Sequence, residues 1–236
     1  MDKKGDLIIN GSGSSNGGTF SNVTINGKGT INNDIQCAEF DCNGSGTILG
    51  KVTAGYAKIN GGVKITGDLE GKKVEVNGTA KVEHNVSVDR LKVDGKATIG
   101  GKVKAEEIRI KGRLTVEEDC EAEFFKAESQ FKIGGLLNAE HIDIKLFGEC
   151  RAKEIGGETI SIKNKDALFG LFKSFFPTQL ETEFIEGNHI EIENTKAKVI
   201  RGNHCIIGPN CEIGLVEYTD QISIDKSANV MESKKV

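Results

Sequence analysis

The feature that most constrains this sequence is a repeat with a period of about 17 residues, which runs from Val23 to Thr159. The repeat divides this stretch into eight blocks, the last with one extra residue, and the same positions are apolar in each block. The blocks begin at Val23, Phe40, Ala57, Val74, Leu91, Ile108, Phe125 and Ile142. A shorter block precedes them and begins at Leu7. A fixed period of this size over most of a domain is typical of a solenoid.

The apolar positions predict the path of the chain within each block. Positions 1, 3, 7, 9, 13 and 15 hold apolar residues, alanine or glycine. Residues two apart lie on one face of a strand, so each pair of positions predicts a short strand with an inward face. The longer steps between pairs predict corners. Three strands and three corners per block predict an all-β fold, a single-stranded parallel β-helix that is triangular, with about 17 residues per coil.

Glycine and asparagine mark the predicted corners. Positions 4 and 5 read Asn-Gly in several blocks, as at Asn60-Gly61. Both residue types accept a positive φ, so we expect them to let the chain turn sharply. In the eighth block the expected apolar position falls on Glu154, and the apolar residue follows at Ile155. We therefore predict one inserted residue between Cys150 and Ile155, in a bulged corner, because an unpaired buried carboxylate is costly.

The repeat also predicts how the chain is divided. Regular coils are expected over residues 7–163, a Phe-rich insertion over 164–184, and a continuation of the β-helix over 185–230. Short polar tails are expected at residues 1–6 and 231–236. We predict that the insertion leaves the β-helix as a short amphipathic helix, ended by Pro177, and contacts a membrane surface, a partner or the β-helix itself. Its apolar surface would consist of Leu168, Phe169, Leu171, Phe172, Phe175 and Phe176.

The cysteines and histidines fit the repeat without a catalytic or metal site. All six cysteines fall at inward positions, and buried cysteine behaves as a small hydrophobic residue, so we expect reduced packing residues. A metal site of Cys205 and Cys211 with His204 would lack a Cys-x-x-Cys pair. The histidines fall at corners or outward positions, without a positioned nucleophile. We therefore predict no catalytic residue, no metal and no cofactor.

Charge and motifs exclude further classes of function. The formal charge of -4 is spread evenly, without a basic block, so nucleic acid is not an expected partner. No glycine cluster is followed by Lys-Ser or Lys-Thr opening a helix, so no nucleotide is expected either. The sequence shows no signal peptide and no apolar run of about 18 residues. We therefore expect a cytoplasmic protein.

The two ends of the predicted β-helix lack a polar cap. Few residues precede the first coil or follow the last. An uncovered end coil exposes unpaired backbone groups, which is the solenoid form of the exposed edge strand. We therefore expect end coils to stack on those of another copy. The predicted interface consists of Leu7, Ile8, Ile9, Ile222, Ile224 and Val230.

Gly-rich coils such as Val74–Val82 and Leu91–Val103, with the short polar N-terminus and uncapped ends, resemble the bactofilins. These are polymer-forming bacterial cytoskeletal proteins, and the likeness is best over Leu7–Ala139. The resemblance implies a right-handed triangular β-helix and nucleotide-independent filaments that assemble end to end. It also implies association with itself or a paralogue, at the inner face of the cell membrane, in support of cell shape or motility. It thus implies a structural protein and not an enzyme.

Two other classes of function stay open. A left-handed β-helix acyltransferase that uses an acyl-CoA is built from hexapeptide repeats, three to a coil, and positions 1, 7 and 13 of these blocks are also six apart. The third side is one residue short in the first seven blocks, which disfavours this class. A solenoid adhesin or lyase would require secretion, which the missing signal peptide and the inward cysteines oppose.

Overall fold

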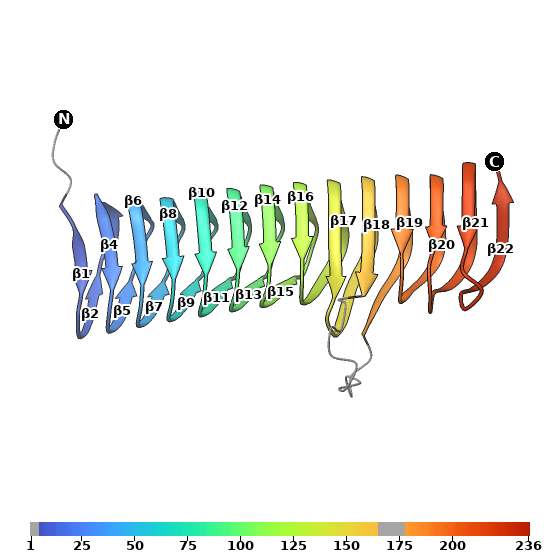
Figure 1. The fold of residues 1–236 in the computed structure, drawn as a ribbon. Helices are drawn as coiled ribbons and strands as arrows, with labels where there is room; N and C mark the ends of the chain where they lie inside the picture. Colours follow the sequence, from blue (N-terminus) through green and yellow to red (C-terminus); the bar gives the residue numbers. More distant parts are fainter. Residues whose placement is uncertain (1–4, 165–177) are drawn as a thin grey trace. The chain divides into compact units, whose positions relative to one another are not determined.

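The computed structural model describes residues 5–164 and 178–236, and all regular structure in these residues is β-strand. The chain forms two compact units, residues 1–118 and 119–236. In each unit, parallel strands stack coil on coil as a β-solenoid, which confirms the predicted fold class (Figure 1). None of the described residues forms a helix that could cross a membrane.

The N-terminal unit is built from coils of constant length. A strand residue pairs with its equivalent one repeat further on, as Val74 does with Leu91. The first described coil is one residue shorter, since Leu7 pairs with Val23. The strands are β1 (Leu7–Ile9), β2 (Ser12–Ser15), β3 (Gly18–Thr19), β4 (Asn22–Ile25), β5 (Lys28–Ile31), β6 (Ile35–Cys42), β7 (Ser45–Ile48), β8 (Val52–Ile59), β9 (Gly62–Ile65), β10 (Leu69–Val76), β11 (Thr79–Val82), β12 (Val86–Val93), β13 (Lys96–Ile99), β14 (Val103–Ile110) and β15 (Arg113–Val116).

The predicted inward positions form the core of this unit. In β12, buried and exposed residues alternate except at Asp89 and Arg90, where two exposed residues follow one another. The chain bends there, so one strand supplies two sides of the triangle. A full coil therefore holds two strands and not the predicted three, because pairing continues through this corner. The third side is the four-residue strand, in which Ala97 and Ile99 of β13 are buried.

Glycine is required at the Asn-Gly corners for a different reason from the predicted one. Positive φ is confined, among described glycines, to Gly17, Gly18 and Gly148, so these corners do not use it. Instead, a Cβ on Gly61 would lie 2.0 Å from the carbonyl oxygen of Gly44 in the preceding coil. Any side chain would push the coils apart, and glycine is required by close stacking of the backbones.

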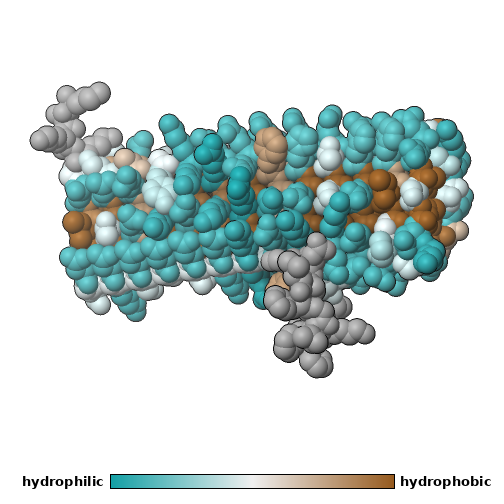
Figure 2. All heavy atoms as spheres, in the orientation of Figure 1, coloured by the Kyte–Doolittle hydropathy of each residue, from teal (hydrophilic) through white to brown (hydrophobic). Residues whose placement is uncertain are grey.

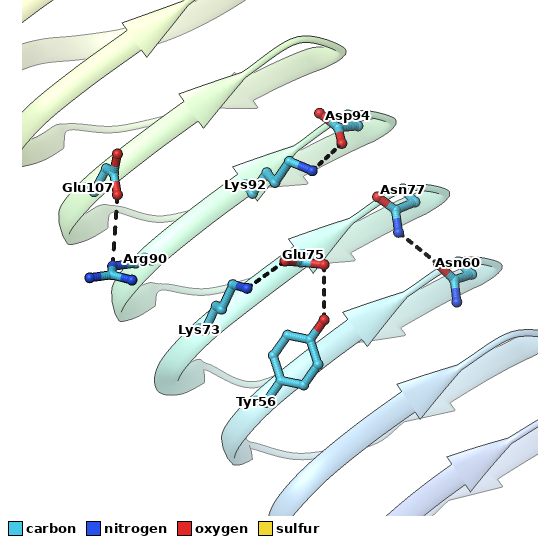
Figure 3. Close-up of polar contacts among 9 residues, drawn as sticks. All are labelled: Tyr56, Asn60, Lys73, Glu75, Asn77, Arg90, Lys92, Asp94 and Glu107. Atoms are coloured by element: carbon cyan, nitrogen blue, oxygen red, sulfur yellow. Dashed lines mark hydrogen bonds and ion pairs between the residues drawn. The ribbon is translucent and has the colours of Figure 1, made fainter.

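The asparagines of the same corners form a ladder of side-chain hydrogen bonds. Asn60 Nδ2 donates to Asn43 Oδ1 at 2.8 Å, and Asn77 Nδ2 donates to Asn60 Oδ1 at the same distance (Figure 3). Asn43 and Asn26 continue the ladder towards Asn10 with bonds of 3.0 and 2.9 Å. Each amide therefore satisfies its neighbour and fixes the register of successive coils.

The C-terminal unit has coils of unequal length. Ile142 pairs with Ile160, one position beyond the regular period, whereas Ile190 pairs with Cys205, two positions short of it. The long strands are unbroken through most of the coil, as Figure 1 shows for β17 to β21. The strands are β16 (Cys120–Ala127), β17 (Gln130–Leu146), β18 (Glu149–Asn164), β19 (Gln179–Ile192), β20 (Thr195–Ile207), β21 (Glu212–Ile224) and β22 (Asn229–Lys235).

Two predicted boundaries are wrong in this unit. β19 begins at Gln179, inside the predicted insertion 164–184, because buried Leu180 pairs with Cys150 and resumes the core. β22 continues to Lys235, which pairs with Tyr218, so most of the predicted tail 231–236 is strand. Polar side chains misled the prediction there, because backbone pairing does not require apolar residues.

The irregular eighth block is also placed differently from the prediction. Ile155 is buried and pairs with Leu137, as expected. However, Ile133 pairs with Ala152, so Ala152 and not Cys150 takes position 9. The extra residues therefore lie before Cys150, near Gly148 with its φ of 89°, and the following corner is one residue shorter.

Candidate functional site

The first coil of the N-terminal unit presents strand edges. β1 pairs with β4, β2 with β5 and β3 with β6, and within the described part of this unit their other edges have no partner strand. Of the predicted interface residues, Leu7 is half-buried and Ile9 is buried, both in core rows. Ile8 points outward between them and is 59 % exposed. The strand therefore offers an open edge with two core side chains and one lateral one.

The last described coil of the C-terminal unit exposes residues of the core rows. Ile224 continues the row of Ile192 and Ile207, which are at most 1 % exposed, yet Ile224 itself is 41 % exposed. Ile222 and Val230 are half-buried. In the other coils these rows are covered by the next coil, so the exposed apolar surface marks an end that another coil could cover.

The predicted membrane or partner contact lies outside the described residues. Leu168, Phe169, Leu171, Phe172, Phe175 and Phe176 fall in the stretch 165–177. The strands that flank this stretch are described: β18 ends at Asn164 and β19 begins at Gln179. These two flanking strands are consecutive and pair with each other.

The outer face of the N-terminal unit carries polar contacts between successive coils. Tyr56 donates a hydrogen bond to Glu75 at 2.9 Å, and Lys73 forms an ion pair with the same carboxylate at 2.7 Å (Figure 3). Burial, together with the bond to Glu75, raises the pKa of Tyr56 to about 12. The bonds from Lys73 and Tyr56 lower the pKa of Glu75. This cluster stabilises the anion of Glu75, which makes it a poor proton acceptor at neutral pH.

The six cysteines are free and buried, as the inward positions predict. Burial raises the pKa of Cys120 to about 12 and those of Cys150 and Cys211 to about 11. A thiol with a raised pKa is a poor nucleophile at neutral pH, because nucleophilic attack requires the thiolate. The cysteines therefore serve as packing residues.

The histidines lie at corners and outward positions. The rings of His189 and His204 stack in parallel with their centroids 4.8 Å apart, on neighbouring coils. Nδ1 of His204 is buried and has no hydrogen-bond partner among the described residues, and it lies 3.8 Å from a carboxylate oxygen of Asp220. Among the described residues, no three His, Cys, Asp or Glu side chains converge in a way that could hold a metal ion.

A shallow groove of about 730 Å³ crosses β17 to β22 in the C-terminal unit. Its floor includes Ile133, Ala152 and Ile213, and its walls are rows of charged side chains such as Lys196 and Lys198. The sequence did not predict this groove. The sequence pattern that could have indicated the groove is a small inward residue with a charged residue on either side, as in Glu181-Thr-Glu183.

Beside the groove runs an apolar ridge, defined here as Phe184, Val199 and Leu215. These residues occupy neighbouring coils in register and are half-buried. In Figure 2 the last coils, from β19 to β22, show brown hydrophobic atoms between two rows of teal hydrophilic side chains. The corresponding corner of the N-terminal unit is polar, since Asp34 and Asp68 there accept hydrogen bonds from backbone amides.

Comparison with known proteins identifies relatives in one bacterium. The chain is 60% identical over 237 residues to "Uncharacterized protein YhbE" of Bacillus subtilis (strain 168), with all of both chains covered. A stretch of 84 residues is 38% identical to "Uncharacterized protein YhbF" of the same strain, over 36% of this chain and 34% of that protein. No family model matches the sequence, and no solved structure matches it. The chain belongs to the family of the YhbE protein of Bacillus subtilis.

Proposed function

We propose that this protein is a structural, filament-forming protein that assembles end to end without a nucleotide. One observation carries the proposal: Ile224 is 41 % exposed although Ile207, in the same core row, is 1 % exposed. In the N-terminal unit, β1 offers an edge that has no partner strand among the residues described in that unit. A second copy placed on such a coil would continue both the backbone pairing and the core rows.

The remaining features support a scaffold role. The outer faces carry ion pairs between successive coils, such as Lys51 with Glu70 at 2.7 Å and Lys64 with Glu83 at 2.9 Å. These exposed pairs keep the lateral faces hydrated and contribute little stability each. Assembly of cytoskeletal type, in the cytoplasm and in support of cell shape or motility, is the role that the resemblance to bactofilins favours. The stretch 165–177 would hold the filament at the inner membrane surface through its phenylalanines.

Electron microscopy and sedimentation of the purified protein test the assembly. We expect filaments without added nucleotide, and we expect Ile224→Lys to abolish them, because the charge would be buried at the junction. Ile206→Lys is the matched control: Ile206 lies one coil earlier, is 49 % exposed and points outward, so this variant should still assemble. Wild-type protein that stays monomeric at high concentration would refute the proposal.

Liposome flotation tests the membrane contact separately. We expect Phe172→Ser with Phe175→Ser to abolish binding to vesicles while filaments still form. Unchanged binding would assign the contact to another surface. Clear thermal stabilisation by acetyl-CoA would instead favour the acyltransferase class.

A further inference from the structure

The charges of the C-terminal unit are sorted by coil. From β18 to β21, on the outward rows that begin at Arg151, Lys153 and Gly156, the charged residues of one coil share one sign, and the sign changes from each coil to the next. The ridge row differs in β18, where it holds Glu154 in register with Phe184. The four coils define four bands. The basic band of β18 holds Arg151 and Lys153, the acidic band of β19 holds Glu181, Glu183 and Glu186, the basic band of β20 holds Lys196, Lys198 and Arg201, and the acidic band of β21 holds Glu212 and Glu217.

Neighbouring bands neutralise one another within the chain. Lys198 lies 2.9 Å from Glu183, and Lys196 lies 3.2 Å from Glu212. Arg201 bridges to Glu217 at 2.9 Å and to Glu186 at 4.0 Å. Side chains such as Lys198 remain about three-quarters exposed, so their charges stay available to an incoming surface.

The apolar ridge lies within these bands. Phe184 belongs to the acidic band of β19, Val199 to the basic band of β20 and Leu215 to the acidic band of β21. Arg201 lies over the Phe184 ring, 5.5 Å from its centroid, but all three ridge residues stay half-buried. An apolar centre with charged borders is the anatomy of a protein interface.

The order of the bands selects the partner and its orientation. From β18 to β21 the signs run plus, minus, plus, minus. A second copy in the opposite direction presents minus, plus, minus, plus, so every band meets its complement. A copy in the same direction and register would set like charges against each other, and one displaced by a single coil would match only three of the four bands, so the reversed copy has the greatest charge complementarity. Reversal about the centre also brings Phe184 of one copy against Val199 of the other.

We propose that this banded face binds a second copy of the chain side by side, in antiparallel orientation, about a two-fold axis between β19 and β20. Such an interface is self-complementary, as in most homodimers. The ridge supplies apolar burial, and the bands fix direction and register. This lateral pairing is independent of end-to-end stacking and uses different residues.

Charge reversal in trans tests the pairing. All proteins carry Ile224→Lys, so that end-to-end assembly does not obscure the result. We expect a dimer in low salt by analytical ultracentrifugation, weakened at high salt. Reversing the basic band (Lys196→Glu with Lys198→Glu) should weaken dimerisation about tenfold or more. Reversing the acidic band (Glu181→Lys with Glu183→Lys) should do the same.

The two reversed proteins, when mixed, should form a heterodimer, because each then presents the complement of the other. Lys126→Glu with Lys145→Glu is the control. It removes two basic residues of the same unit that pair with Asp143 and Glu128, away from the banded face, and should leave the dimer intact. Thermal melting confirms that each variant is folded. The proposed pairing would be overturned if the Ile224→Lys protein without charge reversal were monomeric. It would also be overturned if the two reversed proteins were folded but failed to associate when mixed. Both outcomes can be judged whether or not the wild type forms filaments.

Discussion

The adjacent glycines Gly61 and Gly62 provide a matched test of why the corners contain glycine. A Cβ on Gly61 would lie 2.0 Å from the carbonyl oxygen of Gly44, whereas a Cβ on Gly62 would have no neighbouring atom within 4 Å. Neither residue has a positive φ. If close stacking of coils is the reason for glycine, alanine should be harmful at Gly61 and harmless at Gly62.

The expected cost at Gly61 follows from the bonds around it. Relief of the overlap requires the coils to part by roughly 1 Å at this corner, which breaks hydrogen bonds of ordinary length. Four lie there. The backbone amides of Asn60 and Gly61 both donate to the carbonyl oxygen of Cys42 at 2.9 Å, the amide of Gly62 donates to Gly44 at 2.8 Å, and the side chain of Asn60 donates to that of Asn43 at 2.8 Å. Their loss should destabilise the Gly61→Ala protein by about 2–4 kcal/mol. Gly62→Ala should change stability by less than about 1 kcal/mol, towards greater stability.

Hydrogen exchange measured by mass spectrometry is the appropriate assay, because coils of a solenoid open locally and a single unfolding midpoint averages over them. In the Gly61→Ala protein, backbone amides should exchange faster over the coils that hold Gly44, Gly61 and Gly78. Its urea unfolding should also begin at a lower urea concentration than that of the wild type. Equal protection of the backbone amides in the two alanine variants would refute the stacking argument. It would indicate that glycine occurs at these corners because of its intrinsic preference for turns.

Three further predictions concern single side chains. Asn60→Asp removes the amide donor to Asn43, so it should destabilise the protein by about 1 kcal/mol at neutral pH. The folded pKa of the new carboxyl should be raised above its unfolded value of about 4, so this loss shrinks as the pH falls towards about 4, which urea unfolding at pH 7 and at about pH 4 would show. Iodoacetamide should not label native Cys120, whose pKa is about 12, but should label it in denaturant; rapid native labelling would show that the core opens. Because the folded pKa of this thiol lies above its unfolded value, its contribution to stability is present below about pH 9 and is lost as the pH rises towards 12. Glu75→Gln should lower the pKa of Tyr56 from about 12, but burial, the larger cause, should keep it above 10 in an absorbance titration.

The repeat was sufficient to predict the coil and its core rows. Apolar positions two apart mark a strand whatever its neighbours are, so Ile99 and Val116 were assigned to the core from spacing alone. Where coil length varies, spacing fails. Cys150 and Ala152 are both small, buried and two apart, so the sequence offers no basis for choosing between them at position 9, and the pairing of Ile133 with Ala152 decides.

The candidate surfaces were predicted less completely than the core. Ile224 could be assigned to an end coil, because it continues the row of Ile207. The ridge was missed, because Phe184 was placed in the predicted insertion and the register with Val199 appears only once β19 is known to begin at Gln179. The bands were missed for the same reason: the signs of Glu183 and Lys198 become a pattern only when both residues are assigned to successive coils.

The hydrogen bonds that join successive coils have a mechanical consequence. Backbone bonds such as that from Lys96 to Gly78, and the asparagine ladder from Asn10 to Asn77, run between coils and not within them. A pull along the stacking direction of the N-terminal unit therefore loads the junctions in series, so every junction carries the full force and the weakest one sets the breaking load. Within one junction the bonds on all sides of the triangle share that force in parallel. The tensile strength of the unit should thus be set by the junction with the fewest hydrogen bonds. Additional coils should lengthen the unit without making it stronger.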